Sequence, residues 1–310
     1  MMAKLIILTL GLASLAGIAS GDEPRPLPVS AHNCYPSNQE GNERLLEALA
    51  LGIDNIEIDL GWDDAGGRLI VGHDASPRPG AVYPEFESYL VPAMEAHWHR
   101  PRADRAPTVL TIDWKTDHPE AVLRFHRFLE GHPAWFSTAP KAAESPLTVR
   151  RLTVCFTGSD RAKDHYDAMI PPGGMYRAFR DRVFGGGEFR RDIADYAPTA
   201  ATAYHRFLTF HWGNVEAGGP PLAGAWTEAD ANRLRSLVDQ VHRQGFRVRF
   251  YGLNGHVGPA VSPYRFRDDE AAKTRWRAAA EAGADWIATD EYKAITGVLR
   301  PPAVPNSSSH

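Results

Sequence analysis

Short apolar runs alternate with longer amphipathic segments along most of the chain, and this rhythm limits its folds more than any other feature. Such alternation predicts parallel α/β architecture. We expect eight strands, at 28–32, 53–60, 108–114, 152–156, 175–179, 207–210, 246–251 and 286–289. We expect helices between them, among which the clearest patterns lie at 42–51, 120–129, 228–244 and 268–282.

Eight such units match a (β/α)8 barrel, which takes about 250 residues, and the chain has 310. We therefore predict a single TIM-type barrel over residues 21–300 and a flexible tail over 301–310. Two of the expected helices end at Gly245 and Gly283, each followed by an apolar run, which is how helix–turn–strand units read. An open doubly wound sheet is the alternative fold.

The N-terminus carries an apolar stretch from Leu5 to Ile18 behind Lys4, followed by small residues. The stretch is shorter than the ~20 residues of a membrane-spanning helix. It predicts a signal peptide over residues 1–20 and a secreted or periplasmic protein, with an uncleaved anchor as the alternative. The two cysteines, Cys34 and Cys155, are read either as one disulfide or as two buried thiols.

Charge excludes one class of partner. The chain has 34 Lys and Arg against 38 Asp and Glu, a net charge of −4. A nucleic-acid binder needs a basic surface. We therefore expect no nucleic-acid partner.

Two carboxylates mark the second expected strand. Glu57 and Asp59 stand two residues apart between apolar neighbours, and residues i and i+2 of a strand share a face. The carboxylates repel each other unless a cation lies between them. A polar strand end that faces solvent is the alternative reading.

The residues after Asp59 read as a β-hairpin extension of the second strand. A turn at Gly66 and Gly67 separates two arms, and the return arm ends in His73 and Asp74. If the arms pair, His73 returns to the carboxylates.

Neighbouring strands add more polar groups. His32 ends the first expected strand, and Asp113 and Lys115 share a face at the end of the third. Parallel barrel strands end at one mouth, so we expect these side chains to lie near Glu57 and Asp59. A salt bridge between Lys115 and Asp113 is the structural alternative for the lysine.

This order of residues resembles the superfamily of phosphatidylinositol-specific phospholipase C-like phosphodiesterases. The motifs are His32-Asn33, Glu57-x-Asp59, His73-Asp74 and Asp113-x-Lys115. Glycerophosphodiester phosphodiesterases and sphingomyelinases D share this order. The likeness covers residues 28–117, and beyond them only the run 286–290 looks like the family's last strand.

Two positions depart from the glycerophosphodiesterase pattern. Asn33 stands where those enzymes usually have Arg, and Asp113 stands where they usually have Glu. Both departures point toward the sphingomyelinase D-like branch or the altered-inheritance-of-mitochondria-6-like branch.

Three carboxylates without cysteine suit a hard cation, Mg²⁺ or Ca²⁺, better than zinc, and the resemblance favours Mg²⁺. We expect Glu57, Asp59 and Asp113 to be its ligands. Lys115 would hold the substrate phosphate, and His32 and His73 would divide the proton transfers. The further substrate-binding candidates are Asn33, His211 and Asn254.

The resemblance implies a metal-dependent phosphodiesterase that hydrolyses or cyclises a phosphodiester. Its substrate would be a glycerophosphodiester or a phospholipid headgroup, in solution or in transient contact with a membrane surface. Two other readings stay open: a barrel enzyme of carbohydrate or isomerase chemistry, and a catalytically inactive relative that acts as a binding protein.

Overall fold

The structure is a computed structural model that describes residues 27–35, 41–99, 107–142, 146–185, 191–257 and 263–300. The predicted signal peptide over 1–20 and the predicted tail over 301–310 lie outside these residues.

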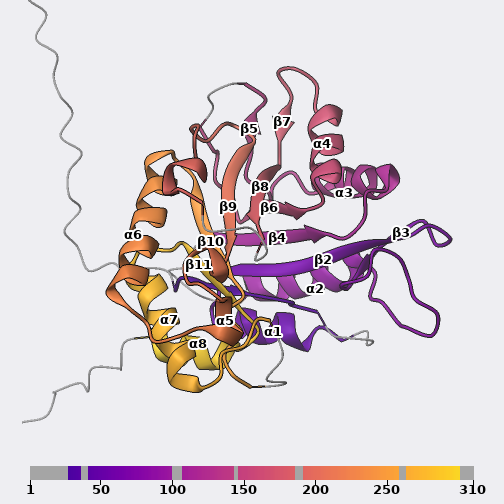
Figure 1. Ribbon diagram of the computed structural model, residues 1–310. Helices are drawn as coiled ribbons and strands as arrows, with labels where there is room; N and C mark the ends of the chain where they lie inside the picture. The colour runs from indigo at the N-terminus through magenta and orange to yellow at the C-terminus, as the bar shows by residue number, and fades with distance from the viewer. Residues whose placement is uncertain are drawn as a thin grey trace, which may run out of the picture.

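Eight parallel strands form a closed barrel (Figure 1). Each strand pairs with the next one along the chain, and β1 pairs with both β2 and β11, which closes the ring. The predicted (β/α)8 fold is thereby confirmed. The barrel strands are β1 (Val29–Ala31), β2 (Asn55–Asp63), β4 (Thr108–Trp114), β6 (Leu152–Gly158), β8 (Ala178–Phe184), β9 (His205–His211), β10 (Arg247–Tyr251) and β11 (Trp286–Thr289).

Helices surround the barrel, with α3 and α4 on one side of Figure 1 and α6, α7 and α8 on the other. Within the described ranges, none of these helices has the length and hydropathy needed to cross a membrane. The α-helices are α1 (Glu43–Ala50), α2 (Phe86–His99), α3 (Pro119–Gly131), α4 (Asp160–Met169), α5 (Gly219–Leu222), α6 (Glu228–Arg243), α7 (Asp269–Glu281) and α8 (Tyr292–Leu299). Two short 3₁₀ helices are η1 (Ile193–Asp195) and η2 (Trp212–Asn214).

Helix α6 shows how the sequence sets these elements. Thr227 and Asp230 form a capping box at its start, which satisfies backbone N–H groups that have no partner within the helix. Its buried residues repeat at helical spacing and form the face turned toward the core; they are Leu234, Leu237, Val238 and Val241. The chain leaves the helix at Gly245, whose φ of 80° favours glycine.

The fifth barrel strand differs from the prediction of residues 175–179. The structure places it at β8, whereas β7 (Met175–Tyr176) pairs outside the barrel with β5 (Ala139–Pro140). The sequence does not indicate a strand here, because the run Arg180-Asp181-Arg182 carries three charges and barrel strands are mostly apolar. Asp181 points inward and is fully buried, while Arg180 pairs with acidic residues of α4 on the outside.

Strand β2 continues past the barrel and pairs antiparallel with β3 (Arg68–Val71), at the right of Figure 1. The pairing runs from Leu60 opposite Val71 to Asp63 opposite Arg68. The chain therefore folds back toward the barrel mouth immediately after β3.

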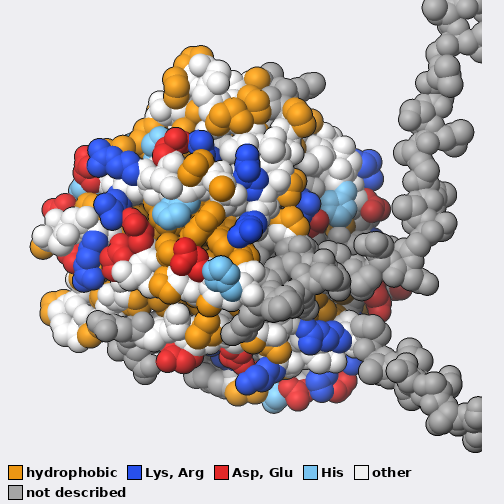
Figure 2. All heavy atoms as spheres, turned by 180° about the vertical axis from the view of Figure 1, so that it is seen from behind, with side chains coloured by type: hydrophobic (Ala, Val, Ile, Leu, Met, Phe, Trp, Pro, Cys, Tyr) orange, Lys and Arg blue, Asp and Glu red, His pale blue; other side chains and the backbone are white. Residues whose placement is uncertain are grey.

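Cys34 and Cys155 are both buried free thiols, so the two do not form a disulfide. On the face shown in Figure 2, Lys and Arg side chains are interspersed with Asp and Glu. That face carries mixed charge over its described residues.

Candidate active site

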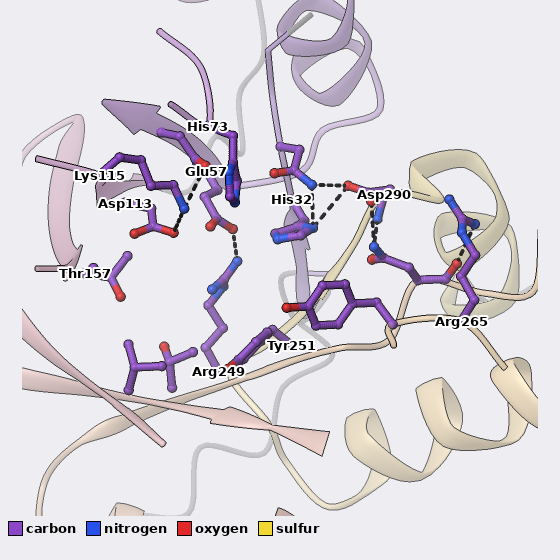
Figure 3. A pocket seen from close by; sticks show the side chains of 17 residues that line it. His32, Glu57, His73, Asp113, Lys115, Thr157, Arg249, Tyr251, Arg265 and Asp290 are labelled. Atoms are coloured by element: carbon purple, nitrogen blue, oxygen red, sulfur yellow. Dashed lines mark hydrogen bonds and ion pairs between the residues drawn. The ribbon is translucent and has the colours of Figure 1, made fainter. Parts of the chain in front are cut away.

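A cavity of about 570 Å³ opens at the carboxyl ends of the barrel strands (Figure 3). Most of its lining side chains are polar or charged. They are His32, Asn33, Glu57, Asp59, His73, Asp113, Lys115, Thr157, Gly158, Val183, Thr209, Arg249, Tyr251, Asn254, Tyr264, Arg265 and Asp290.

The three carboxylates meet in this cavity. Strands β2 and β4 are parallel and in a register that sets Asp59 beside Asp113, and Glu57 shares the face of Asp59 one step deeper. One carboxylate oxygen from each residue lies within 4.8 Å of the others. The cluster has the size and the ligand type of a hard-cation site.

Lys115 bridges two of the acids. Its Nζ lies 2.9 Å from Asp59 Oδ2 and 2.6 Å from Asp113 Oδ2, and the Tyr35 hydroxyl lies 2.8 Å from the same Asp59 oxygen. The other oxygen, Asp59 Oδ1, is buried and has no hydrogen-bond partner. A buried carboxylate oxygen is rarely left unpartnered, so Oδ1 is poised to accept a ligand.

The charges within the cluster shift its protonation. Burial, followed by the nearby charge of Asp113, raises the pKa of Asp59 to about 7. Burial acts against the charged form of Lys115, but the two carboxylates outweigh it and raise the pKa of the ammonium. The cluster thus strongly favours any cation placed among its oxygens.

A buried arginine from β10 pairs with the third acid. Arg249 Nη2 donates to Glu57 Oε2 in a close ion pair, and Arg249 Nε donates to Ser30 Oγ at 3.0 Å. Arg249 and Glu57 are 5% and 3% exposed, so the pair lies inside the barrel. The sequence interpretation did not include Arg249.

His32 follows β1, and its ring is held across the seam, which is the place where β11 pairs with β1 and closes the barrel. Its Nδ1 lies 3.1 Å from Asp290 Oδ1, just after β11. Burial opposes the charged imidazole, but Glu57 and Asp290 outweigh it and raise the pKa of His32. Burial likewise acts to raise the pKa of Asp290, yet the hydrogen bonds from His32 and Asn33 lower it. Asp290 thus orients the ring and favours its protonated form.

The two asparagines predicted to bind substrate also hydrogen-bond to Asp290. Asn254 Nδ2 donates to Asp290 Oδ2 at 2.6 Å, and Asp290 N–H donates back to Asn254 Oδ1 at 3.0 Å. Asn33 Nδ2 donates to Asp290 Oδ1 at 3.0 Å from a left-handed backbone with a φ of 52°. Both residues also line the cavity.

Arg44 of α1 supports the same corner. Its guanidinium donates to the carbonyl oxygens of Asn33, at 2.7 Å, and of His32, at 3.2 Å. It also lies 3.4 Å from Asp290 Oδ1 and stacks over the ring of Tyr292. The backbone at His32 is thereby fixed from both sides of the seam.

The hairpin delivers His73 to the mouth. Gly72 N–H donates to the Asp59 carbonyl at 3.0 Å, which ties the return arm to the strand that carries the acids. Burial and then the charge of Lys115 lower the pKa of His73. Asp74 binds Arg78 and Tyr83 through its carboxylate, and His73 lines the cavity.

His211, unlike Asn33 and Asn254, lies outside the cavity although all three are predicted to bind substrate. It ends β9, as the sequence indicates, but it is 9% exposed and is not among the described residues that line the cavity. Its Nδ1 accepts from Gly213 N–H, and its ring packs against Tyr251 and Tyr264. His211 therefore supports those two lining tyrosines.

Nine of the described lining residues are not among the site candidates predicted from the sequence. They are Thr157, Gly158, Val183, Thr209, Arg249, Tyr251, Tyr264, Arg265 and Asp290. Tyr251 and Asp290 stand at or just after a strand end, the signal that identified His32. Arg265 bonds to the Asn254 carbonyl and to Glu291. The last two strands and the loop between them thus add further charged and aromatic side chains to a site whose acids lie on β2 and β4.

Solved structures share this fold. A protein assigned as a glycerophosphoryl diester phosphodiesterase from Silicibacter pomeroyi matches with a TM-score of 0.54 and 12% identity, over 89% of this chain and 94% of that one. A phosphodiesterase from Oleispira antarctica, solved in complex with the product sn-glycerol-3-phosphate, matches with a TM-score of 0.50 and 11% identity, over 87% and 95%. No family model and no curated protein matches the chain.

At this identity the likeness establishes the fold. The first neighbour is assigned as a glycerophosphoryl diester phosphodiesterase and the second is named a phosphodiesterase, and the sequence motifs resemble a superfamily of such enzymes. The chain has the (β/α)8 fold of that superfamily along nearly its whole described length.

Proposed function

We propose that this protein is a divalent-metal-dependent phosphodiesterase that acts on a small phosphodiester. One observation carries the proposal: three carboxylates within 4.8 Å, a lysine that bridges two of them and two histidines line one cavity. Phosphoryl transfer needs positive charge beside the phosphate and groups that move protons at the attacking and leaving oxygens.

The residues present fit a hard cation. Glu57, Asp59 and Asp113 supply the carboxylate oxygens that Mg²⁺ and Ca²⁺ prefer. Asp59 Oδ1 is buried and unpartnered, as an oxygen reserved for an ion would be. A cation bound there would offset charge that develops on the phosphate.

Lys115 would add a second positive charge at the same phosphate. Its Nζ bonds to Asp59 and Asp113, so the ammonium is held at a fixed place beside the cluster. Such preorganised charge costs no rearrangement during the reaction.

His32 and His73 would divide the two proton transfers. Asp290 holds Nδ1 of His32, which leaves Nε2 as the nitrogen that exchanges a proton with the reacting oxygen. A carboxylate behind the ring stabilises the imidazolium formed when Nε2 takes up that proton. His73, on the hairpin arm, would serve the other oxygen.

The lining favours a polar substrate. Val183 is the only aliphatic side chain among the described lining residues, so the cavity offers little to an acyl chain. The Oleispira neighbour holds sn-glycerol-3-phosphate, which supports a phosphodiester of a small polar alcohol here. We propose further that the protein is secreted or periplasmic, as the apolar segment at 5–18 indicates.

The test is an activity panel with the full chain. Bis(p-nitrophenyl) phosphate, glycerophosphocholine, lysophosphatidylcholine and sphingomyelin are assayed after EDTA treatment and after Mg²⁺ or Ca²⁺ is restored. We expect turnover only with a cation, lost in Glu57→Gln and retained in the exposed control Glu95→Gln. Full activity after exhaustive chelation would overturn the metal assignment.

A further inference from the structure

The buried pair of Arg249 and Glu57 is more than a structural ion pair, because Glu57 is also a member of the proposed metal site. The three acids of that site meet two side-chain cations: Lys115 contacts Asp59 and Asp113, and Arg249 contacts Glu57. Each of the three acids therefore has a side-chain cation beside it before any ion binds.

Arg249 is held firmly in this position. Ser30 accepts from its Nε and donates in turn to Asn55 Oδ1, each at 3.0 Å. Thr111 donates to the same Asn55 oxygen, also at 3.0 Å. This polar layer, contributed by β1, β2 and β4, fixes the guanidinium beneath the carboxylates.

Burial makes the pair necessary when no metal ion is present. Both side chains are at most 6% exposed. A buried carboxylate without a counter-charge destabilises a fold strongly, so removing one partner of such a pair destabilises the protein. Arg249 therefore supports the metal-free barrel.

When a divalent ion binds, the effect of Arg249 on the site changes from stabilising to destabilising. Once the ion compensates Glu57, the fixed charge of Arg249 is surplus and repels the ion across a few ångströms of barrel interior. We infer that Arg249 is an internal counter-cation that stabilises the metal-free site and, in exchange, weakens its affinity for a divalent ion. This inference rests on the proposed metal site.

A second buried pair provides a matched control. Arg275 Nε and Nη2 bond to both oxygens of Glu216, and both side chains are 4% exposed. The guanidinium stacks between Trp226 and Phe266, and neither Arg275 nor Glu216 lines the cavity. Arg275→Met should lower stability without changing metal binding.

The experiment compares Arg249→Met, Arg249→Lys and Arg275→Met with the wild type. Thermal unfolding is followed with EDTA and with MgCl₂, and the Kd for Mg²⁺ alone is measured by isothermal titration calorimetry. For Arg249→Met we expect a lower melting temperature in EDTA, a larger rise on adding Mg²⁺ and a Kd at least about tenfold lower. If this variant folds only when Mg²⁺ is present, that result also supports the inference.

The lysine variant separates charge from shape. Arg249→Lys keeps the positive charge but loses the forked geometry, so its Kd should stay within about threefold of the wild type. Arg275→Met should melt lower with and without Mg²⁺ by equal amounts. If Arg249→Met melts lower but binds Mg²⁺ no tighter, or if Arg249→Lys binds about tenfold more weakly, Arg249 merely orients Glu57 and the inference falls. A wild type that binds no divalent ion would overturn the proposed metal site as well.

Discussion

The cavity has two walls of different chemistry. The ionisable wall, on or just after β1, β2, β4, β10 and β11, includes His32, Glu57, Asp59, Asp113, Lys115, Arg249 and Asp290. The neutral wall, on β6, β8 and β9, comprises Thr157, Gly158, Val183 and Thr209. One barrel thus confines charge to one side of its mouth and leaves the other side to uncharged groups.

Charged side chains lie buried behind the neutral wall. Asp181 of β8 is fully buried, and Lys163 donates to its backbone carbonyl at 3.0 Å while pairing with Asp160. Neither Asp181 nor Lys163 lines the cavity. The two walls therefore differ in whether their charged side chains can contact a substrate. We expect substitutions in the ionisable wall to lower activity more than substitutions in the neutral wall.

Asp59→Asn tests the ionisable wall most severely. We expect metal-dependent turnover of bis(p-nitrophenyl) phosphate to fall by about 10³ or more, since a ligand at the centre of the cluster is lost. Its melting temperature should stay the same or rise, because the substitution relieves the repulsion from Asp113. The neutral-wall control Val183→Ala should keep its rate within about threefold. Equal losses in the two variants would remove the distinction between the walls.

The two histidines should give the next largest effect. His32→Ala and His73→Ala are each expected to lower kcat by about 10², the scale of a lost general acid or base. Because the two act on one reaction, the double variant should lose less than the product of the single losses. Steady-state kinetics of the three variants decides the matter, and strictly multiplicative losses would assign at least one histidine to binding or structure.

Asp290→Asn tests whether the seam carboxylate acts through His32. We expect kcat near pH 7 to fall by about tenfold, the range found for outer partners of site residues. The Asp290 carboxylate helps to raise the pKa of His32, so its removal should move the corresponding limb of the pH–rate profile to lower pH. A uniform drop in rate with an unmoved profile would indicate a purely structural role.

The smallest expected effect lies away from the cavity. Burial, followed by the charges of Arg180 and Arg182, lowers the pKa of His205 from 6.5 to about 4. Between these values the unfolded state binds more protons, so this group makes the fold less stable as the pH drops below 6.5. From pH 7 to pH 5 the wild type should lose about 2 kcal/mol more stability than His205→Gln. Urea unfolding at the two pH values measures this, and parallel losses would show that His205 titrates normally.

Much of the ionisable wall follows from local rules. Glu57 and Asp59 share a strand face by their spacing, and barrel closure brings Asp113 alongside. The hairpin pattern after Asp59 places His73 in the same way. Each of these inferences needs only neighbouring residues and the convergence of parallel strand ends.

Depth within the barrel does not follow from such rules. Arg247 and Arg249 are two residues apart on one strand, so the sequence assigns both to the same face. Arg247 lies at the strand's start, exposed and over the ring of Trp286, whereas Arg249 lies in the interior. Only the register with β9 and β11 decides which arginine is buried. The wrong position predicted for the fifth strand has a similar cause, because the burial of Asp181 depends on residues far away in the sequence.

The seam between β1 and β11 has a consequence for the order in which the site comes into being. Every carboxylate of the proposed metal site, Lys115 and both histidines precede residue 116 in the chain. Asp290, which orients His32, arrives with the last strand, and β11 also closes the ring. During synthesis the earlier residues of a chain are made first, and a domain generally folds as a unit. A nascent chain would therefore contain the three carboxylates, Lys115 and both histidines early, yet His32 would be oriented only when β11 completes the barrel, so catalysis would begin only in the complete fold.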